Sequence, residues 1–175
     1  MKKIASALVV SSLLLSCGFA NEAKFKDYKS LTKELQAENK KNGTYATIDE
    51  VKAALEAKDW VVADVRTMEE WSAAQIKGSV RIGRESPEVA LENFVLDMEG
   101  KFIKPNMIVV CNSAARASIE AETFRKMGFN QVKIFDIYQW IDKCNPVVTN
   151  YSMSNDKSGS GLKFGEYKAQ HCYNK

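Results

Sequence analysis

Cys111 is the residue whose place in the chain points most directly to chemistry. It follows an apolar run over residues 107–110 and precedes a stretch of small residues that leads through Arg116 into a helical pattern. A cysteine between a buried strand and a helix faces backbone N–H groups and the positive end of the helix dipole, which favour the thiolate over the thiol. We therefore predict that Cys111 is a nucleophile. The alternative is a buried cysteine that only packs in the core.

The elements that must hold Cys111 alternate between strands and helices. Apolar runs typical of buried strands cover residues 60–65, 79–82, 107–110 and 131–135. Thr47 and Glu50 have the spacing of a capping box, and Ser86 followed by Pro87 is typical of a helix start. Strands separated by helices predict an α/β fold with a parallel sheet, whose binding sites gather at the carboxyl ends of the strands.

Three more helical patterns complete the predicted fold. The helix after Cys111 ends near Gly128, and its apolar face consists of Ala114, Ala117, Ala121 and Phe124. A short helix covers residues 138–143. Within residues 21–46, a charged helical extension has an apolar face made of Phe25, Tyr28, Leu31 and Leu35, by which we expect it to pack on the domain.

The first 20 residues are predicted to be a secretory signal. Lys2 and Lys3 precede an apolar stretch over residues 4–15 that is too short to span a bilayer. Two kinds of processing remain open: cleavage before Asn21, or lipidation of Cys17, where the preceding residues resemble a bacterial lipoprotein box. In both cases we expect an exported, periplasmic protein, either free or attached to the membrane by a lipid on Cys17.

Charge and cysteine content limit the partners. The formal charge of +3 falls to +1 without the two leader lysines, so we expect no nucleic acid partner and no membrane contact other than a lipid on Cys17. We also expect no cofactor and no metal. In an oxidising compartment Cys144 and Cys172 are candidates for a disulfide; the alternatives are two unpaired thiols, or one thiol that resolves oxidised Cys111.

Residues 149–175 are predicted to form a linker and a tail. Ser, Asn and Gly dominate up to residue 161, whereas the last residues contain aromatic side chains that can dock on the domain. His171, the one histidine of the chain, lies in this tail. A protease-like pairing of His171 with Cys111 requires the tail to fold over the site, and we do not favour it.

Four groups of residues resemble the rhodanese (sulfurtransferase) family. Asp64-Val65-Arg66, Glu70-Trp71 and residues 75–82 follow its first signature, with Gln75 and Arg81 in place of the usual His and Asn. Residues 111–116 resemble its Cys-x-x-Gly-x-Arg active loop, with Ala114 in place of Gly. The resemblance covers roughly residues 47–148. It implies a three-layer α/β fold with about five parallel strands and helices on both faces.

The resemblance also implies a two-step sulfur transfer. Cys111 would take a sulfane sulfur from thiosulfate or a persulfide and pass it to cyanide or a thiol, which could belong to a protein. The loop that holds the substrate and the persulfide would consist of Asn112, Ser113, Ala114, Ala115, Arg116 and Ala117. Asp64, Arg66 and Glu70 would support this loop by hydrogen bonds, and Arg84 is a candidate for additional positive charge.

The loop length separates this chemistry from phosphate chemistry. Four residues lie between Cys111 and Arg116, as in sulfur-handling rhodaneses, whereas related cysteine phosphatases have five. If the loop needs a positive φ at residue 114, alanine is held there at a cost of about 1 kcal/mol. A strained loop favours a competing hypothesis, a catalytically silent rhodanese module that binds a partner or carries sulfur. A further alternative is a thiol-redox protein.

Overall fold

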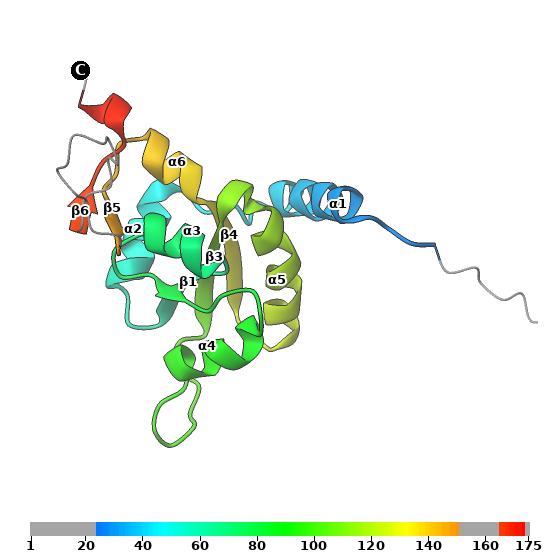
Figure 1. Cartoon of the computed structure of the whole chain (residues 1–175). Coiled ribbons are helices and arrows are strands. Elements are labelled where there is room, and N and C mark those ends of the chain that lie inside the picture. The colour runs from blue at the N-terminus through cyan, green and yellow to red at the C-terminus, as the bar shows by residue number, and fades with distance from the viewer. Residues whose placement is uncertain (1–23, 151–164, 174–175) are drawn as a thin grey trace, which may run out of the picture.

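A four-stranded parallel sheet forms the centre of the molecule. The computed structural model describes residues 24–150 and 165–173. The strands are β1 (Trp60–Asp64), β2 (Val80–Arg81), β3 (Asn106–Cys111) and β4 (Gln131–Asp136), in the order β2-β1-β3-β4. All six residues of β3 are buried, because β3 lies inside the sheet and has helices on both faces (Figure 1). The α/β three-layer fold is therefore confirmed.

Two hydrophobic cores lie on opposite faces of this sheet (Figure 1). One contains side chains of α4 (Pro87–Val95) and α5 (Ala115–Lys126), and the other contains side chains of α2 (Ile48–Glu56) and α6 (Ile137–Asp142). The predicted apolar face after Cys111 is confirmed, since all of its members are fully buried: Ala114, Ala117, Ala121 and Phe124. Cys111 belongs to the core beneath α4 and α5.

The prediction of about five parallel strands is slightly too high. Next to β4, Tyr45 forms a single parallel bridge with Ile134 and does not extend into a strand. The next strand along the chain, β5 (Val147–Thr149), does not join the parallel sheet. It pairs antiparallel with β6 (Gly165–Tyr167). This second, two-stranded sheet attaches the tail to the domain, and the hydroxyl of Tyr167 donates a hydrogen bond to the carbonyl of Ala73 at 2.9 Å.

The predicted helix caps are present, with one difference. Thr47 and Glu50 form a complete capping box at α2, as their spacing predicts. Ser86 precedes α4 and Pro87 occupies its first turn, but the Ser86 side chain makes no capping hydrogen bond. A second capping box, between Thr67 and Glu70, starts α3 (Met68–Ala73).

The helix of the amino-terminal extension uses only part of the face predicted for it, since Leu31 and Leu35 are partly buried. Helix α1 (Tyr28–Lys41) lies beside α5 (Figure 1), but Phe25 is 93 % exposed and Tyr28 is half-exposed. The buried residues of α1 are Thr32 and Asn39, and the Asn39 side chain accepts a hydrogen bond from Arg125 of α5 at 2.7 Å. Polar contacts therefore join the partly buried Leu31 and Leu35 in holding α1 on the domain.

The chain ends are partly within the described structure. The predicted signal, Cys17 and most of the predicted linker fall outside it. Cys144 and Cys172 form a disulfide with a Cα–Cα distance of 5.6 Å, so the pairing is present.

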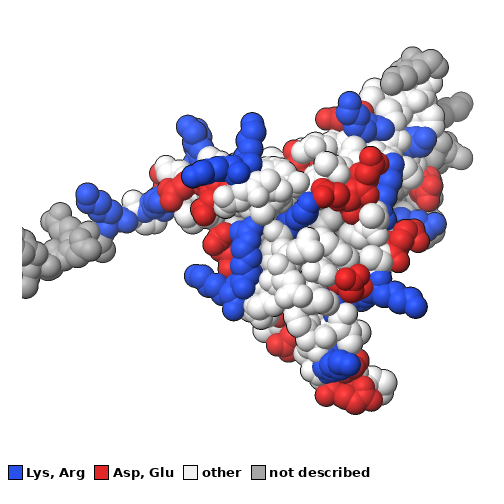
Figure 2. All heavy atoms as spheres, turned by 180° about the vertical axis from the view of Figure 1, so that it is seen from behind, with Lys and Arg blue, Asp and Glu red and all other residues white. Residues whose placement is uncertain are grey.

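In the described residues, no helix is both long enough and apolar enough to cross a membrane. On the face shown in Figure 2, basic and acidic side chains alternate without a continuous patch of one sign.

Candidate active site

Cys111 lies at the carboxyl end of β3, where the backbone turns sharply into α5. The turn is a short 3₁₀ segment, η1 (Asn112–Ala114), in which Ser113 and Ala114 both have left-handed backbones with φ of 54° and 57°. This turn directs the backbone N–H of Ala117 at the Cys111 sulfur, at 3.3 Å. The expected positive φ at residue 114 is therefore present, although the residue is alanine.

Burial opposes ionisation of this thiol. Cys111 is 0 % exposed, and its Sγ–H donates to the carbonyl of Asn112 at 3.0 Å. Burial raises the pKa of Cys111 above its ordinary value of 9.0, and the Ala117 N–H and the Arg116 charge lower it by less. The sequence correctly indicates the N–H groups that favour the thiolate, but it does not reveal that desolvation outweighs them.

Glu70 connects three parts of the site through one carboxylate. It accepts hydrogen bonds from both terminal nitrogens of Arg116, at 2.6 and 2.8 Å, and from the amide of Asn112 at 2.6 Å. The backbone N–H of Thr67 donates to the same carboxylate at 3.0 Å. The Arg116 guanidinium, followed by the Thr67 N–H, holds the pKa of Glu70 at about 2, against an ordinary 4.5. Glu70 thus ties the start of α3 to both ends of the loop.

Asp64 and Arg66 form a buried ion pair beneath this connection. The Arg66 side chain donates to both carboxylate oxygens of Asp64 at 2.7 to 3.0 Å, and both side chains are almost completely buried. Arg66 also donates to the carbonyls of Glu70 and Ala74, at 3.3 and 2.6 Å. These bonds fix α3, and through α3 they fix the position of the Glu70 carboxylate.

Arg84 and His171 do not join the site. Arg84 is exposed, its backbone N–H donates to Glu85, and its charge acts on Glu120. The charged side chains that influence the Cys111 pKa are Arg116 and Asp64. His171 lies 3.4 Å from the carbonyl of Asp142, next to the disulfide, so the pairing with Cys111 that we did not favour is absent.

Sequence reasoning missed three residues that contact or influence the loop. Gln36 of α1 donates to the carbonyl of Ser113 at 2.6 Å, and Asp136 accepts from the Ser113 N–H at 3.2 Å. The phenol of Tyr45 lies close enough to Cys111 for a charge on the sulfur to raise the Tyr45 pKa, although burial is the main cause of that shift. Asp136 could have been found, because it ends the strand next to β3 and is the register partner of Cys111. Nothing in the sequence indicates the contact made by Gln36.

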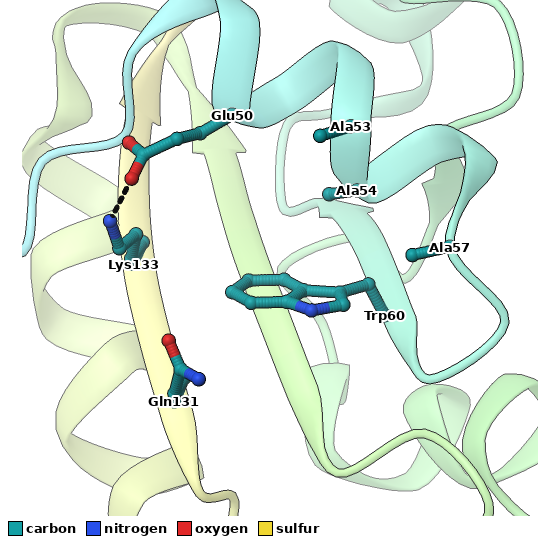
Figure 3. Close-up of a pocket in the computed structure, with 7 residues that line it drawn as sticks. All are labelled: Glu50, Ala53, Ala54, Ala57, Trp60, Gln131 and Lys133. Carbon is teal, nitrogen blue, oxygen red and sulfur yellow. Dashed lines mark hydrogen bonds and ion pairs between the residues drawn. The ribbon is translucent and has the colours of Figure 1, made fainter.

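A hollow of about 190 Å³ lies between α2 and the amino-terminal ends of β1 and β4 (Figure 3). It is lined by Glu50, Ala53, Ala54, Ala57, Trp60, Gln131 and Lys133. Trp60 and Gln131 begin their strands whereas Cys111 ends its own, so in a parallel sheet the hollow is far from Cys111. It is also smaller than the roughly 300 Å³ at which ligand pockets begin. This hollow therefore takes no part in any chemistry at Cys111.

The family of the chain follows from its sequence together with this site. A family model for the rhodanese-like domain matches residues 47–140, more than half of the chain, and this range includes the Cys111 loop and Glu70. The chain therefore belongs to the rhodanese-like family. A comparison with curated proteins found no match.

Solved structures show similar folds at low sequence identity. The polysulfide-sulfur transferase homodimer of Wolinella succinogenes is 22% identical, with coverage of 74% of this chain and 93% of that one, at a TM-score of 0.55. A single-domain sulfurtransferase of Saccharomyces cerevisiae is 20% identical over 57% of this chain and 89% of its own, at a TM-score of 0.44. The first likeness supports the fold, and the second is too distant to support an argument.

Ala114→Gly tests the left-handed turn against a matched alanine. Ala114 and Ala121 are both fully buried, but Ala121 lies within the right-handed α5. Ala121→Gly should lower the free energy of unfolding by about 2 kcal/mol through lost methyl burial and added backbone freedom. Ala114→Gly also relieves a left-handed alanine, worth about 1–2 kcal/mol, so we expect a change below about 1 kcal/mol. Urea unfolding measures both variants, and equal losses would contradict the strain at Ala114.

Glu70→Gln tests the carboxylate that joins α3 to the loop. We expect the free energy of unfolding to fall by about 2 kcal/mol at pH 7, because charge-assisted hydrogen bonds are lost. The neighbouring exposed Glu69→Gln should change it by less than about 0.5 kcal/mol. Since folding lowers the pKa of Glu70, its contribution is complete above pH 4.5 and disappears as the pH falls toward 2. A difference between wild type and Glu70→Gln that persists unchanged at pH 2 would contradict this role.

The reactivity of Cys111 should increase with pH into the alkaline range. Only the thiolate reacts with iodoacetamide, and burial raises the pKa of Cys111, so the alkylation rate should keep rising above pH 9. Mass analysis of the peptide that contains Cys111 measures this rate. Gln36→Ala should accelerate alkylation at every pH, because it removes the hydrogen bond to the carbonyl of Ser113. It should leave the midpoint of the rate against pH unchanged, because the Ala117 N–H stays in place. A plateau below pH 7 would contradict the raised pKa.

Proposed function

We propose that this protein transfers sulfane sulfur through a persulfide on Cys111. The observation that carries the proposal is the contact between the Ala117 N–H and the Cys111 sulfur in a loop with four residues between Cys111 and Arg116. Such a loop directs backbone N–H groups toward the sulfur, where they would stabilise the negative charge of a persulfide. Membership of the rhodanese-like family supports the same chemistry.

The transfer has two balanced steps. The Cys111 thiolate attacks the outer sulfur of the donor and forms a new S–S bond, while the donor's own bond to that sulfur breaks and its remainder leaves with the electron pair. A thiophilic acceptor, cyanide or a thiolate, then attacks the outer sulfur of the persulfide and releases the Cys111 thiolate. No net oxidation occurs, so the cycle needs no cofactor.

The hydrogen bonds that Arg116 makes to Glu70 affect which sulfur donors the site can bind. Both of its terminal nitrogens donate to Glu70, which neutralises most of its charge toward the substrate. Arg116 therefore serves mainly to hold the loop, and a doubly charged donor such as thiosulfate gains little from it. This arrangement favours a persulfide, a polysulfide or a sulfur carried by a protein thiol.

The burial of Cys111 favours one alternative within the same family. A fully buried thiol with a raised pKa, beside a strained Ala114, is also what a catalytically silent module would contain. Such a module would use the same loop to bind a partner, or would carry sulfur without turnover. The thiol-redox alternative has less support, because Cys144 and Cys172 are bonded to each other and so neither is free to resolve Cys111.

We place this activity outside the cytosol. The leader over residues 1–20 supports export, and the disulfide between Cys144 and Cys172 is typical of an oxidising compartment. Processing either before Asn21 or at Cys17 is compatible with a periplasmic protein, and lipidation of Cys17 would attach it to the membrane.

Sulfur loading tests the enzyme against the silent module. Incubation with polysulfide should add the mass of one sulfur atom to the intact protein, and cyanide should remove it. Cys111→Ser should abolish the gain, whereas Cys144→Ser with Cys172→Ser should retain it. Arg116→Ala should slow loading by about tenfold or more without unfolding the domain, because the loop loses its tie to Glu70.

Two outcomes would contradict the proposal. A folded protein that gains no sulfur from polysulfide, a small persulfide or thiosulfate would instead be a silent module. Sulfur that loads equally well onto Cys111→Ser would show that another cysteine carries it.

A further inference from the structure

The docked tail brings three ligands for soft metals together, away from the Cys111 site. One donor atom from each of Cys144, His171 and Cys172 lies within 4.8 Å of the other two. Cys144 follows α6, whereas His171 and Cys172 are consecutive residues of η2 (Gln170–Cys172). The two cysteines are currently joined in the disulfide, and none of the three residues takes part in the sulfur-transfer chemistry.

The local backbone directs these side chains toward one another. Cys144 has a left-handed backbone with φ of 60°, at the turn that ends α6. Its sulfur lies 4.0 Å from the carbonyl oxygen of Asp142, and a ring nitrogen of His171 lies 3.4 Å from the same oxygen. The imidazole and the Cys144 sulfur therefore both approach the end of α6 around one backbone oxygen.

Contacts other than the disulfide also attach the tail to the domain. Three residues of β6 pair with β5, and the hydroxyl of Tyr167 bonds to the carbonyl of Ala73 at 2.9 Å. Lys168, which follows β6, donates its backbone N–H to the hydroxyl of Tyr173 at 3.0 Å and so closes the turn that contains η2. Breaking the S–S bond thus leaves His171 and Cys172 within reach of Cys144.

We propose that, once the disulfide is reduced, Cys144, His171 and Cys172 bind a thiophilic d¹⁰ cation such as Zn²⁺. A dithiol reductant supplies two electrons and two protons, breaks the S–S bond and leaves as its own disulfide. Each cysteine then loses its proton to solvent as it binds the ion, and neutral His171 contributes a ring lone pair. Two thiolates balance the charge of the divalent ion, so the half-buried site is electrically neutral.

The geometry of the ligands suits this exchange. Tetrahedral zinc places its two sulfurs roughly 3.8 Å apart and each sulfur about 3.5 Å from a nitrogen ligand. The two sulfurs must therefore separate by roughly 1.7 Å from their bonded distance, which rotation about the Cys side chains can supply at a Cα–Cα distance of 5.6 Å. The fourth position stays open to water or to the carbonyl oxygen of Asp142. The disulfide and the metal exclude each other, so the redox state of the pair controls binding.

Zinc titration of the full chain tests this site. The protein is reduced with a dithiol, freed of reductant under anaerobic conditions, and titrated with zinc against a coloured chelator. The reduced protein should bind one zinc ion more than the oxidised protein. The double variant Cys144→Ser, Cys172→Ser should lose that ion, while Cys111→Ser, which changes only the other described thiol, should bind it as well as wild type does.

His171→Ala separates a metal site from a simple dithiol. This variant keeps both cysteines, so it can form the disulfide and retain the fold, yet it should bind zinc at least about tenfold more weakly. Non-reducing mass analysis verifies that its disulfide forms. Equal zinc affinity of His171→Ala and wild type would overturn the three-ligand site, as would a reduced wild type that binds no more zinc than the double cysteine variant.

Discussion

The geometry of the reactive loop depends on one carboxylate. Glu70 accepts from Asn112 and Arg116 on either side of the left-handed turn, and from the backbone N–H of Thr67, the residue that caps α3. A turn with two consecutive left-handed residues is unfavourable by itself, so something outside it must fix its ends. The buried pair of Asp64 and Arg66 places α3, and α3 places Glu70. The shape of the site thus originates in β1, several elements earlier in the chain than Cys111.

Much of this arrangement could be predicted from the sequence, because it depends on local patterns. Apolar runs locate β1, β3 and β4, since strands buried on both faces have little alternation. The position of Cys111 between such a run and a helix predicts its place at the carboxyl edge of the sheet. The capping box of Thr47 and Glu50 is equally local and is predicted correctly.

The remaining features depend on contacts between residues that are far apart in the sequence, which no local pattern predicts. Desolvation raises the pKa of Cys111, and the Ala117 N–H and the Arg116 charge lower it by less. The burial of the sulfur atom, which decides this balance, cannot be read from its neighbours in sequence. The leucines of the extension helix are only partly buried, whereas Asn39 is buried beside Arg125 of α5, a hydrogen-bond partner that the local sequence does not indicate. The missing fifth parallel strand has a similar cause: β5 pairs with the distant β6 of the tail.

The polar attachment of α1 has a consequence for the timing of any reaction at Cys111. When α1 lifts from α5, the groups that lose partners at Gln36 and Asn39 can bond to water instead, so the free-energy cost of local opening is much smaller than that of global unfolding. Because Gln36 donates to the carbonyl of Ser113, each such opening also frees one side of the loop. The accessibility of the loop to large molecules would then follow the fraction of time that α1 spends detached.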